Sequence, residues 1–181
     1  MMRVFVGISL PDDVIDALDD LQSDLRVGTP MFASTFHVTL AFLDSQPPQT
    51  VQFLHESLGE IALPAFSMLI RGVDVFGGNA PRLVWAGVEP SKQLSTLRDK
   101  VRRAATDVGI DLPRQKFRPH VTLSRIRGRL RGDEPAKLAQ FLSQNAAFSA
   151  PEFDVTRFSL LQSTLHPEGA VHVSLADYSL Q

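Results

Sequence analysis

The residues most capable of chemistry stand in two copies of one tetrapeptide. His37-Val38-Thr39-Leu40 lies in the first half of the chain and His120-Val121-Thr122-Leu123 in the second. Alternate side chains of a β-strand share a face, so in each copy the histidine and the threonine point the same way. If the two polar faces turn toward each other, two imidazoles and two hydroxyls surround a single point.

Two imidazoles beside two hydroxyls suit the cleavage of a phosphodiester without a metal ion. One neutral imidazole takes a proton from the attacking water, and one imidazolium gives a proton to the departing ribose oxygen, because histidine titrates close to neutral pH. Thr39 and Thr122 are suitable hydrogen-bond donors to the phosphoryl oxygens. Arg118 and Arg125 flank the second motif and could add charge-assisted hydrogen bonds, although their spacings from His120 differ in parity.

Each motif also has simpler interpretations. A single H-x-T sequence is common by chance, and a lone buried histidine is usually structural. Identical tetrapeptides at matched positions of two half-chains favour a shared site instead. A zinc pair is a rival because imidazole binds zinc well, but no carboxylate or third histidine stands at ligand spacing. We therefore expect His37 and His120 to act as an acid/base pair, with no metal and no other cofactor.

The remaining histidines and the tryptophan carry weaker signals. His55 lies in a helical pattern and His166 in a turn, so both are predicted to be surface residues. His172 falls early in the last strand, where contact with the cleft and simple exposure are equally compatible with the pattern. Trp85, the only tryptophan, is predicted to pack between sheet and helix.

Three phenylalanines near the motifs have two interpretations. Phe42, Phe76 and Phe117 are predicted to belong to the core. The alternative is that one of them stacks on a substrate base, which is how proteins commonly hold single-stranded RNA. Phe42 and Phe117 are therefore kept as candidates for substrate contact, together with Arg118 and His172.

The elements that must position these residues occur twice in the same order. Each half of the chain runs strand, helix, strand, helix, strand, and a further strand closes the second half. The predicted strands span residues 3–9, 36–43, 66–76, 82–88, 116–126, 153–161 and 171–178, and the predicted helices span 11–25, 48–61, 91–108 and 133–144. Strands that alternate with helices predict an α/β (α+β) fold. We expect one domain over residues 1–181, with two pseudo-symmetric lobes formed by residues of about 1–80 and 81–181 around a central cleft.

The bulk composition limits the class of protein. The chain has 44% hydrophobic and 21% charged residues and no cysteine, which excludes disulfides, thiolate metal sites and cysteine nucleophiles. No apolar run has the length of a signal-peptide core or a bilayer span, so we expect a cytoplasmic protein with no membrane partner. Of the 18 Lys and Arg residues, 11 lie between Arg98 and Arg131. This segment either faces a polyanion or forms an ordinary solvated surface.

Four phrases that contain the motifs resemble one known family. RVFVGISLP, HVTLAFL, KFRPHVTLSR and LLQSTLHPEG occur in this order and resemble the two-histidine phosphoesterases, in particular the RNA 2',3'-cyclic phosphodiesterases also called 2'-5' RNA ligases. The resemblance covers essentially the whole chain. It departs at Met31-Phe32, where relatives usually have a tryptophan, and at His172, where relatives often have tyrosine.

The resemblance implies a bilobed α/β fold with both motifs lining a central cleft, and hydrolysis of a terminal 2',3'-cyclic phosphate to a 2'-phosphate. By the same resemblance His37 is the proton donor and His120 the proton acceptor. Thr39, Thr122 and Arg125 are implied to contact the phosphate. The expected partner is an RNA or nucleotide that ends in a 2',3'-cyclic phosphate, and we expect a monomer. Reversible 2'-5' joining of RNA, or a module that binds RNA without turnover, are the alternatives.

Overall fold

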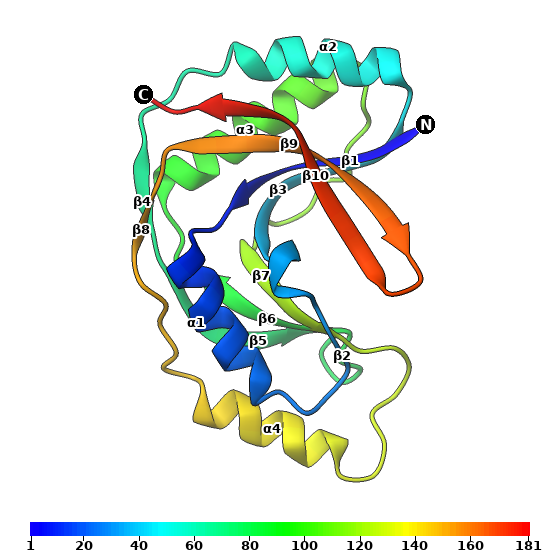
Figure 1. Ribbon diagram of the computed structural model, residues 1–181, viewed down its shortest axis with the longest axis vertical. Helices are drawn as coiled ribbons and strands as arrows, with labels where there is room; N and C mark the ends of the chain where they lie inside the picture. Colours follow the sequence, from blue (N-terminus) through cyan, green and yellow to red (C-terminus); the bar gives the residue numbers. More distant parts are fainter.

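Two four-stranded antiparallel sheets form the two lobes of the protein, and the computed structural model describes all of residues 1–181 (Figure 1). The first sheet has the order β10 (Gly169–Ser179), β9 (Arg157–His166), β1 (Met2–Ser9) and β3 (His37–Gln46). The second sheet has the order β2 (Thr29–Pro30), β7 (His120–Arg125), β6 (Leu83–Val88) and β5 (Ile70–Phe76). A ribbon of β4 (Phe66–Met68) and β8 (Phe153–Val155) runs between the lobes at the left of the view.

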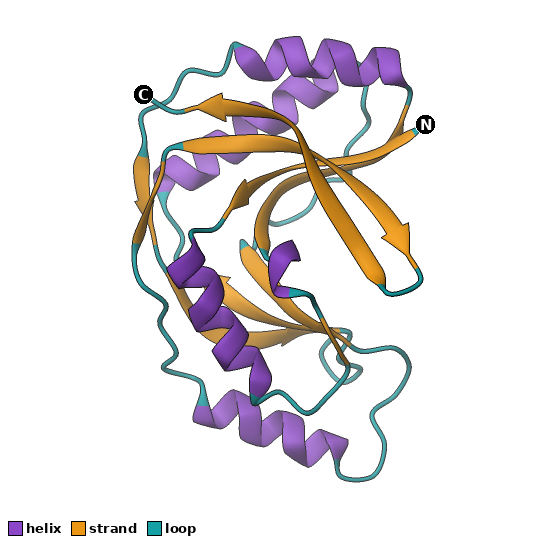
Figure 2. Ribbon diagram, viewed as in Figure 1, coloured by secondary structure: helices purple, strands orange, loops and turns teal.

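Four α-helices and one short 3-10 helix cover the sheets (Figure 2). They are α1 (Asp12–Ser23), η1 (Ala33–Thr35), α2 (Pro48–Gly59), α3 (Lys92–Asp107) and α4 (Glu134–Gln144). Ser91 caps the N-terminus of α3, since its hydroxyl accepts a hydrogen bond of 3.1 Å from the Leu94 amide. None of these helices combines the length and the apolar character needed to cross a bilayer.

Each lobe is built from both halves of the chain. β5 comes from the first half but pairs with β6, while β9 comes from the second half and pairs with β1. The helices are exchanged in the same way. The first-half helix α1 packs on β7, and the second-half helix α3 packs on β3. The mixed α/β fold with two lobes is as predicted, but the lobes do not coincide with residues 1–80 and 81–181. The sequence pattern specifies the order of the elements and leaves their pairing open.

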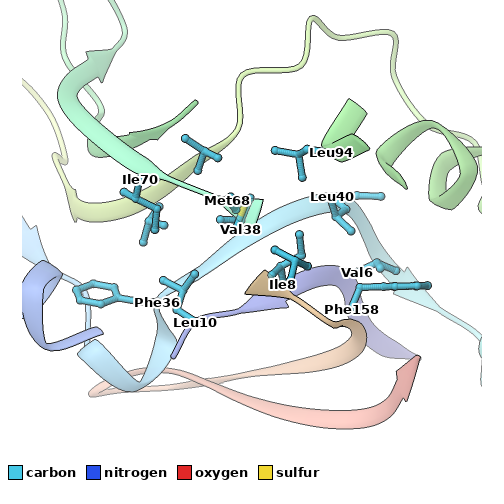
Figure 3. Packing of buried hydrophobic residues seen from close by; sticks show 14 of the residues in the cluster. Val6, Ile8, Leu10, Phe36, Val38, Leu40, Met68, Ile70, Leu94 and Phe158 are labelled. Atoms are coloured by element: carbon cyan, nitrogen blue, oxygen red, sulfur yellow. The ribbon is translucent and has the colours of Figure 1, made fainter. Parts of the chain in front are cut away.

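A core of 39 buried residues fixes the orientation of the motif strands (Figure 3). Val38 and Leu40 of β3 are buried in this core, where Ile8 of β1 and Leu94 of α3 are also buried. Val121 and Leu123 play the same part in β7. Because side chains alternate across a strand, burying the apolar pair of each motif turns its histidine and threonine to the opposite face.

Most strand ends differ from the prediction by a few residues, and three predicted strands differ more than that. Residues 66–76 are divided at Leu69 into β4 and β5, and residues 153–161 are divided at Thr156 into β8 and the start of β9. In both places the chain passes from the connecting ribbon into a sheet. The strand predicted from Lys116 begins at His120, directly after Pro119, because proline has no amide proton to donate to a neighbouring strand. β2 and η1 were not predicted.

Candidate active site

The imidazole of His37 is anchored on both ring nitrogens. Its Nδ1 donates to the carbonyl oxygen of Thr35 at 2.7 Å, and its Nε2 lies 2.9 Å from the Thr39 hydroxyl oxygen. In the neutral ring Nε2 therefore accepts the hydroxyl proton of Thr39. Burial is the main cause that lowers the pKa of His37 to about 4, and the nearby His172, His120 and Arg125 lower it further.

The imidazole of His120 has the same anchor on one nitrogen only. Its Nδ1 donates to the carbonyl oxygen of Arg118 at 2.7 Å, which again is the residue two positions earlier. This bond places the lone pair of a neutral ring on Nε2, which is available to a substrate. Burial lowers the pKa of His120 below its ordinary value, and the charge of Arg125 acts in the same direction.

One cavity of about 440 Å³ brings the two motifs together. It is lined by His37 and Thr39 from one sheet and by His120, Thr122 and Arg125 from the other. The sequence predicted such a shared point for the two histidines and two threonines, and the structure places all four side chains around it. No group of three or more His, Cys, Asp or Glu side chains is arranged to hold a metal ion.

A β-bulge follows the threonine in both motif strands. Gly7 of β1 pairs with Thr39 and Val6 pairs with Ala41, which leaves Leu40 as an extra residue in β3. In the other sheet Trp85 pairs with Thr122 and Val84 with Ser124, which leaves Leu123 as an extra residue in β7. The fourth residue of each tetrapeptide is thus the bulge, and such bulges often re-aim side chains next to functional sites.

The bulges decide which later side chains reach the cavity. The six residues that begin at each motif histidine have one common order of burial: half-buried, buried, half-buried, buried, buried and exposed. Strict alternation would place the fifth residue after each histidine on the opposite face. The bulge reverses the parity, so Phe42 and Arg125 both line the cavity with the motif histidines. The bulge therefore explains how Arg125, which lies an odd number of residues after His120, faces the same cavity as that histidine.

Aromatic rings surround each histidine. The ring of His37 lies 4.6 Å from that of Phe5 and 5.1 Å from that of His172, between ring centroids. His172 also lines the cavity, so of its two predicted positions the structure shows contact with the cleft. The ring of His120 lies 4.9 Å from that of Phe76 and 5.8 Å from that of Trp85.

The structure corrects two aromatic predictions. Trp85 packs beside Phe76 and His120 rather than between sheet and helix, because it alternates with the buried Val84 and Ala86 and so faces the other side of the sheet. Phe42 is 47% exposed rather than part of the core. Phe76 and Phe117 are half-buried.

A second and larger cavity adjoins the first. It has a volume of about 910 Å³, and Phe117 and Arg118 line it without lining the cavity that contains His37. Thr39, Phe42 and His120 line both cavities. His55 and His166 are exposed as predicted and line neither cavity.

Sequence reasoning missed several residues of the site, and two of them lie on β1. Arg3 and Phe5 of β1 line the smaller cavity, and the guanidinium carbon of Arg3 lies 5.1 Å from the ring centroid of Phe42. Arg3 takes part in none of the four ion pairs of the structure. The sequence gives no signal for this position, since it becomes visible only once β1 is known to pair with β3.

The chain matches one known protein family over most of its length. The family described as the 2'-5' RNA ligase superfamily matches residues 10–167. The chain belongs to this superfamily. Among curated members, an RNA 2',3'-cyclic phosphodiesterase of Aeropyrum pernix is 32% identical over 155 residues, which cover 83% of this chain and 86% of the relative. A protein of the same name from Geobacillus stearothermophilus is 30% identical over 166 residues, which are 86% of this chain and 52% of that relative, so the chain spans about half of its length.

Solved structures of superfamily members share the fold. The apo form of LigT from Escherichia coli superposes with a TM-score of 0.81 at 22% identity, over 99% of this chain and 98% of that one. TT0787 of Thermus thermophilus superposes with a TM-score of 0.78 at 25% identity, over 98% and 97% of the two chains. The two-lobed arrangement is therefore that of LigT-type proteins of this superfamily.

Proposed function

We propose that this protein is an RNA 2',3'-cyclic phosphodiesterase, a phosphoric diester hydrolase that converts a terminal 2',3'-cyclic phosphate to a 2'-phosphate. The observation that carries the proposal is the convergence of His37, Thr39, His120, Thr122 and Arg125 on one cavity. The names of the curated relatives support the same activity. The absence of cysteine supports a cytoplasmic enzyme, which we propose to act as a monomer.

The proposed reaction is an in-line displacement at phosphorus. Nε2 of His120 takes a proton from water, the water oxygen bonds to phosphorus, and the bond from phosphorus to the ribose 3' oxygen breaks. Nε2 of His37 gives its proton to the departing 3' oxygen. The hydroxyls of Thr39 and Thr122 and the guanidinium of Arg125 donate hydrogen bonds to the phosphoryl oxygens, where negative charge accumulates.

The proton donor must be charged when the substrate is bound. Burial holds the pKa of His37 at about 4, so its ring is neutral at pH 7 before the substrate binds. A phosphodiester carries a negative charge, which favours the imidazolium and raises the pKa of a neighbouring histidine. The bound substrate therefore favours uptake of a proton from solvent by His37, and the ring then delivers this proton to the leaving oxygen.

The test is hydrolysis of a 2',3'-cyclic mononucleotide in excess chelator, with chromatographic separation of the 2'- and 3'-monophosphates. We expect turnover that chelator does not reduce and a product that is the 2'-monophosphate alone. A 3'-monophosphate product would contradict the assignment of the leaving oxygen. A protein that gives no product, or gives product only with added divalent metal, would contradict the two-histidine mechanism.

A further inference from the structure

One polar side chain, Gln22, belongs to the buried face of α1, whose other buried residues are apolar. Its amide nitrogen Nε2 donates to the carbonyl oxygen of Met31 at 2.8 Å and to that of Leu123 at 2.6 Å. Both protons of one side-chain amide are therefore used on backbone carbonyls from the two halves of the chain. Gln22 lines neither of the two cavities that contain the motif residues.

The carbonyl of Leu123 belongs to the bulge that follows the second motif. Leu123 is the extra residue in β7, and its carbonyl oxygen accepts a second hydrogen bond, of 2.9 Å, from the amide of Met31. Since Met31 directly follows β2, this carbonyl points to the side of β7 that lies away from β6. The bulge decides that Arg125 faces the cavity, so Gln22 holds the backbone group on which the direction of Arg125 depends.

The carbonyl of Met31 opens the segment that anchors His37. Met31 lines the smaller cavity and is followed by Phe32 and η1. In this segment the amide and the hydroxyl of Thr35 both donate to the carbonyl oxygen of Phe32, at 2.8 and 2.7 Å. The carbonyl oxygen of Thr35 in turn accepts from Nδ1 of His37. Because the segment is short and hydrogen-bonded within itself, a shift of Met31 is passed on to the anchor of His37.

The chain before Met31 also lies close against β7. Thr29 pairs with Arg125, and the buried hydroxyl of Ser124 donates to the carbonyl oxygen of Val27 at 2.9 Å. A Cβ atom at Gly28, where φ is +78°, would lie 2.5 Å from the Ser124 hydroxyl oxygen. These contacts fix the backbone beyond the bulge, whereas the amide of Gln22 is the side-chain group that bonds to the bulge itself.

We propose that Gln22 is a positioning residue for the hydrolysis. Its amide fixes the bulge of β7 relative to the segment before His37, so that Arg125 and His37 face the same phosphate. This inference rests on the proposed function. Gln22 takes no part in proton transfer, since it lines neither cavity, and it acts through the two residues that it aligns. A misplacement of about 1 Å at a reacting group can lower a rate by about 100-fold.

The substitution Gln22→Met separates this role from packing. Methionine has a similar length and fills the same space, but it has no proton to donate. If Gln22 only filled space beside Leu18 and Leu21, an apolar side chain of the same size would be tolerated. If Gln22 positions the site, the carbonyl of Met31 loses its side-chain donor and the bulge loses one of its two listed donors, from Gln22 and from Met31.

The test measures the hydrolysis of a 2',3'-cyclic mononucleotide in excess chelator. We expect Gln22→Met to lower kcat by about tenfold or more, because Arg125 and His37 are displaced. KM should stay within about twofold of the wild type, since the rings of Phe5 and Phe42 lie on β1 and β3, which Gln22 does not contact through a hydrogen bond.

Asn145→Leu is the matched control. Asn145 at the end of α4 also donates from its side-chain amide to a backbone carbonyl, that of Phe141 at 2.9 Å, and it lines neither cavity. Its replacement should lower the urea midpoint of unfolding and leave kcat and KM within about twofold of the wild type. A loss of kcat that merely follows lost stability would appear in this control as well.

A double-mutant cycle tests whether Gln22 acts through Arg125. Residues that act as one unit give losses that do not multiply. In an Arg125→Ala background, Gln22→Met should therefore lower kcat by no more than about threefold, against about tenfold in the wild-type background. Gln22→Asn is the second variant, and it carries the same test if Gln22→Met does not fold. It keeps an amide but is one methylene too short to reach both carbonyls, so kcat should again fall.

Three results would overturn the positioning role while the proposed hydrolase stands. They are a kcat within about twofold of the wild type in folded Gln22→Met or Gln22→Asn, an equal loss with and without Arg125, and an equal loss in Asn145→Leu. An absence of hydrolysis in the wild type would instead overturn the proposed function, and the role of Gln22 with it.

Discussion

The two motif strands have the same local construction and different surroundings. In β3 and in β7 the histidine Nδ1 donates to the carbonyl two residues earlier, and a bulge follows the threonine. Only His37 has its Nε2 bonded to the motif threonine, at 2.9 Å. The fifth residue after the histidine is Phe42 in one strand and Arg125 in the other.

This difference shows how a duplicated motif can serve two unequal tasks. In the proposed mechanism both strands must direct an imidazole at one phosphorus, and the backbone geometry that does so is the same in β3 and β7. The chemistry that must differ is placed just beyond the bulge, where a ring can hold a base on one side and a cation can stabilise phosphoryl charge on the other. The four predictions below test this division, from the largest expected effect to the smallest.

Removing either imidazole should give the largest loss. We expect His37→Ala and His120→Ala each to lower kcat for a cyclic mononucleotide by about 10²- to 10⁴-fold, because each takes away one proton-transfer group. Since the two groups act in one displacement, the double variant should lose much less than the product of the single losses. Circular dichroism confirms that each variant is folded.

His55→Ala is the matched control for these variants. His55 lies on α2, where its Nδ1 lies 2.9 Å from the Tyr178 hydroxyl and it lines neither cavity. Its replacement should leave kcat within about twofold of the wild type, as expected for a surface position. Full activity in either motif variant would remove that histidine from the mechanism.

Replacing Arg125 should mainly change kcat, and replacing Phe42 should mainly change KM. Loss of charge-assisted hydrogen bonds in Arg125→Ala removes about 1.5–3 kcal/mol, so kcat should fall by roughly 10- to 100-fold. Phe42→Ala removes about 1–3 kcal/mol of base stacking, which should raise KM and leave kcat nearly unchanged. Steady-state kinetics on cyclic mononucleotides measures both constants. Equal effects of the two variants on kcat would mean that the two positions do not divide the tasks.

The pH dependence of kcat/KM measures how far the pKa values of the two histidines differ. One histidine must be charged and the other neutral, so kcat/KM should peak between their two pKa values. One pKa is about 4 and the other lies below the ordinary value of 6.5, so the peak should lie below pH 6.5. At higher pH the protonated donor becomes scarcer, and kcat/KM should fall by about tenfold per pH unit. The profile of kcat should be shifted to higher pH, because the bound phosphodiester raises both pKa values. A peak of kcat/KM above pH 7.5 would contradict the burial of the two rings.

Two glycines probe the backbone beside each motif. A methyl group at Gly7 would lie 2.9 Å from the Val38 carbonyl oxygen and 3.5 Å from a ring carbon of His37, whereas one at Gly87 would lie 2.8 Å from the Arg71 carbonyl oxygen. Gly7→Ala and Gly87→Ala should each lower the free energy of unfolding by about 1–3 kcal/mol, as is typical of overpacking. Both variants should also lower kcat, because Gly7 lies beside His37 and Gly87 pairs with His120. Urea unfolding and kcat of the folded variants separate the two effects.

The sequence predicted most of the local structure and the central pair, because both depend on short-range patterns. Alternation in the H-x-T strands and the helical spacing of Leu94, Leu97 and Val101 are sufficient to predict those elements and their buried faces. The repeat of the tetrapeptide predicted that His37 and His120 meet, and both line one cavity.

The features that the sequence could not predict depend on pairing. A bulge appears only when two strands are aligned, so the position of Arg125 relative to His120 could not be derived from spacing along one strand. The same limit applies to Arg3, which reaches the site through the pairing of β1 with β3, and to the assignment of β5 and β9 to their sheets. The position of Trp85 was predicted wrongly, because the sequence of a strand does not show on which face of the sheet a hydrophobic ring lies.

The sheet that contains His37 is completed late in biosynthesis, because its strands β9 and β10 are synthesised long after β1 and β3. β9 pairs with β1, and β10, which ends at Ser179, supplies His172 beside His37. A nascent polypeptide still missing these last strands contains both H-x-T sequences and Phe5 but lacks the ring of His172 beside His37. Contacts between the two ends of the chain also form slowly during folding, because closing a long loop precedes any gain from them. The site should therefore be complete only after β10 has been synthesised and has paired with β9.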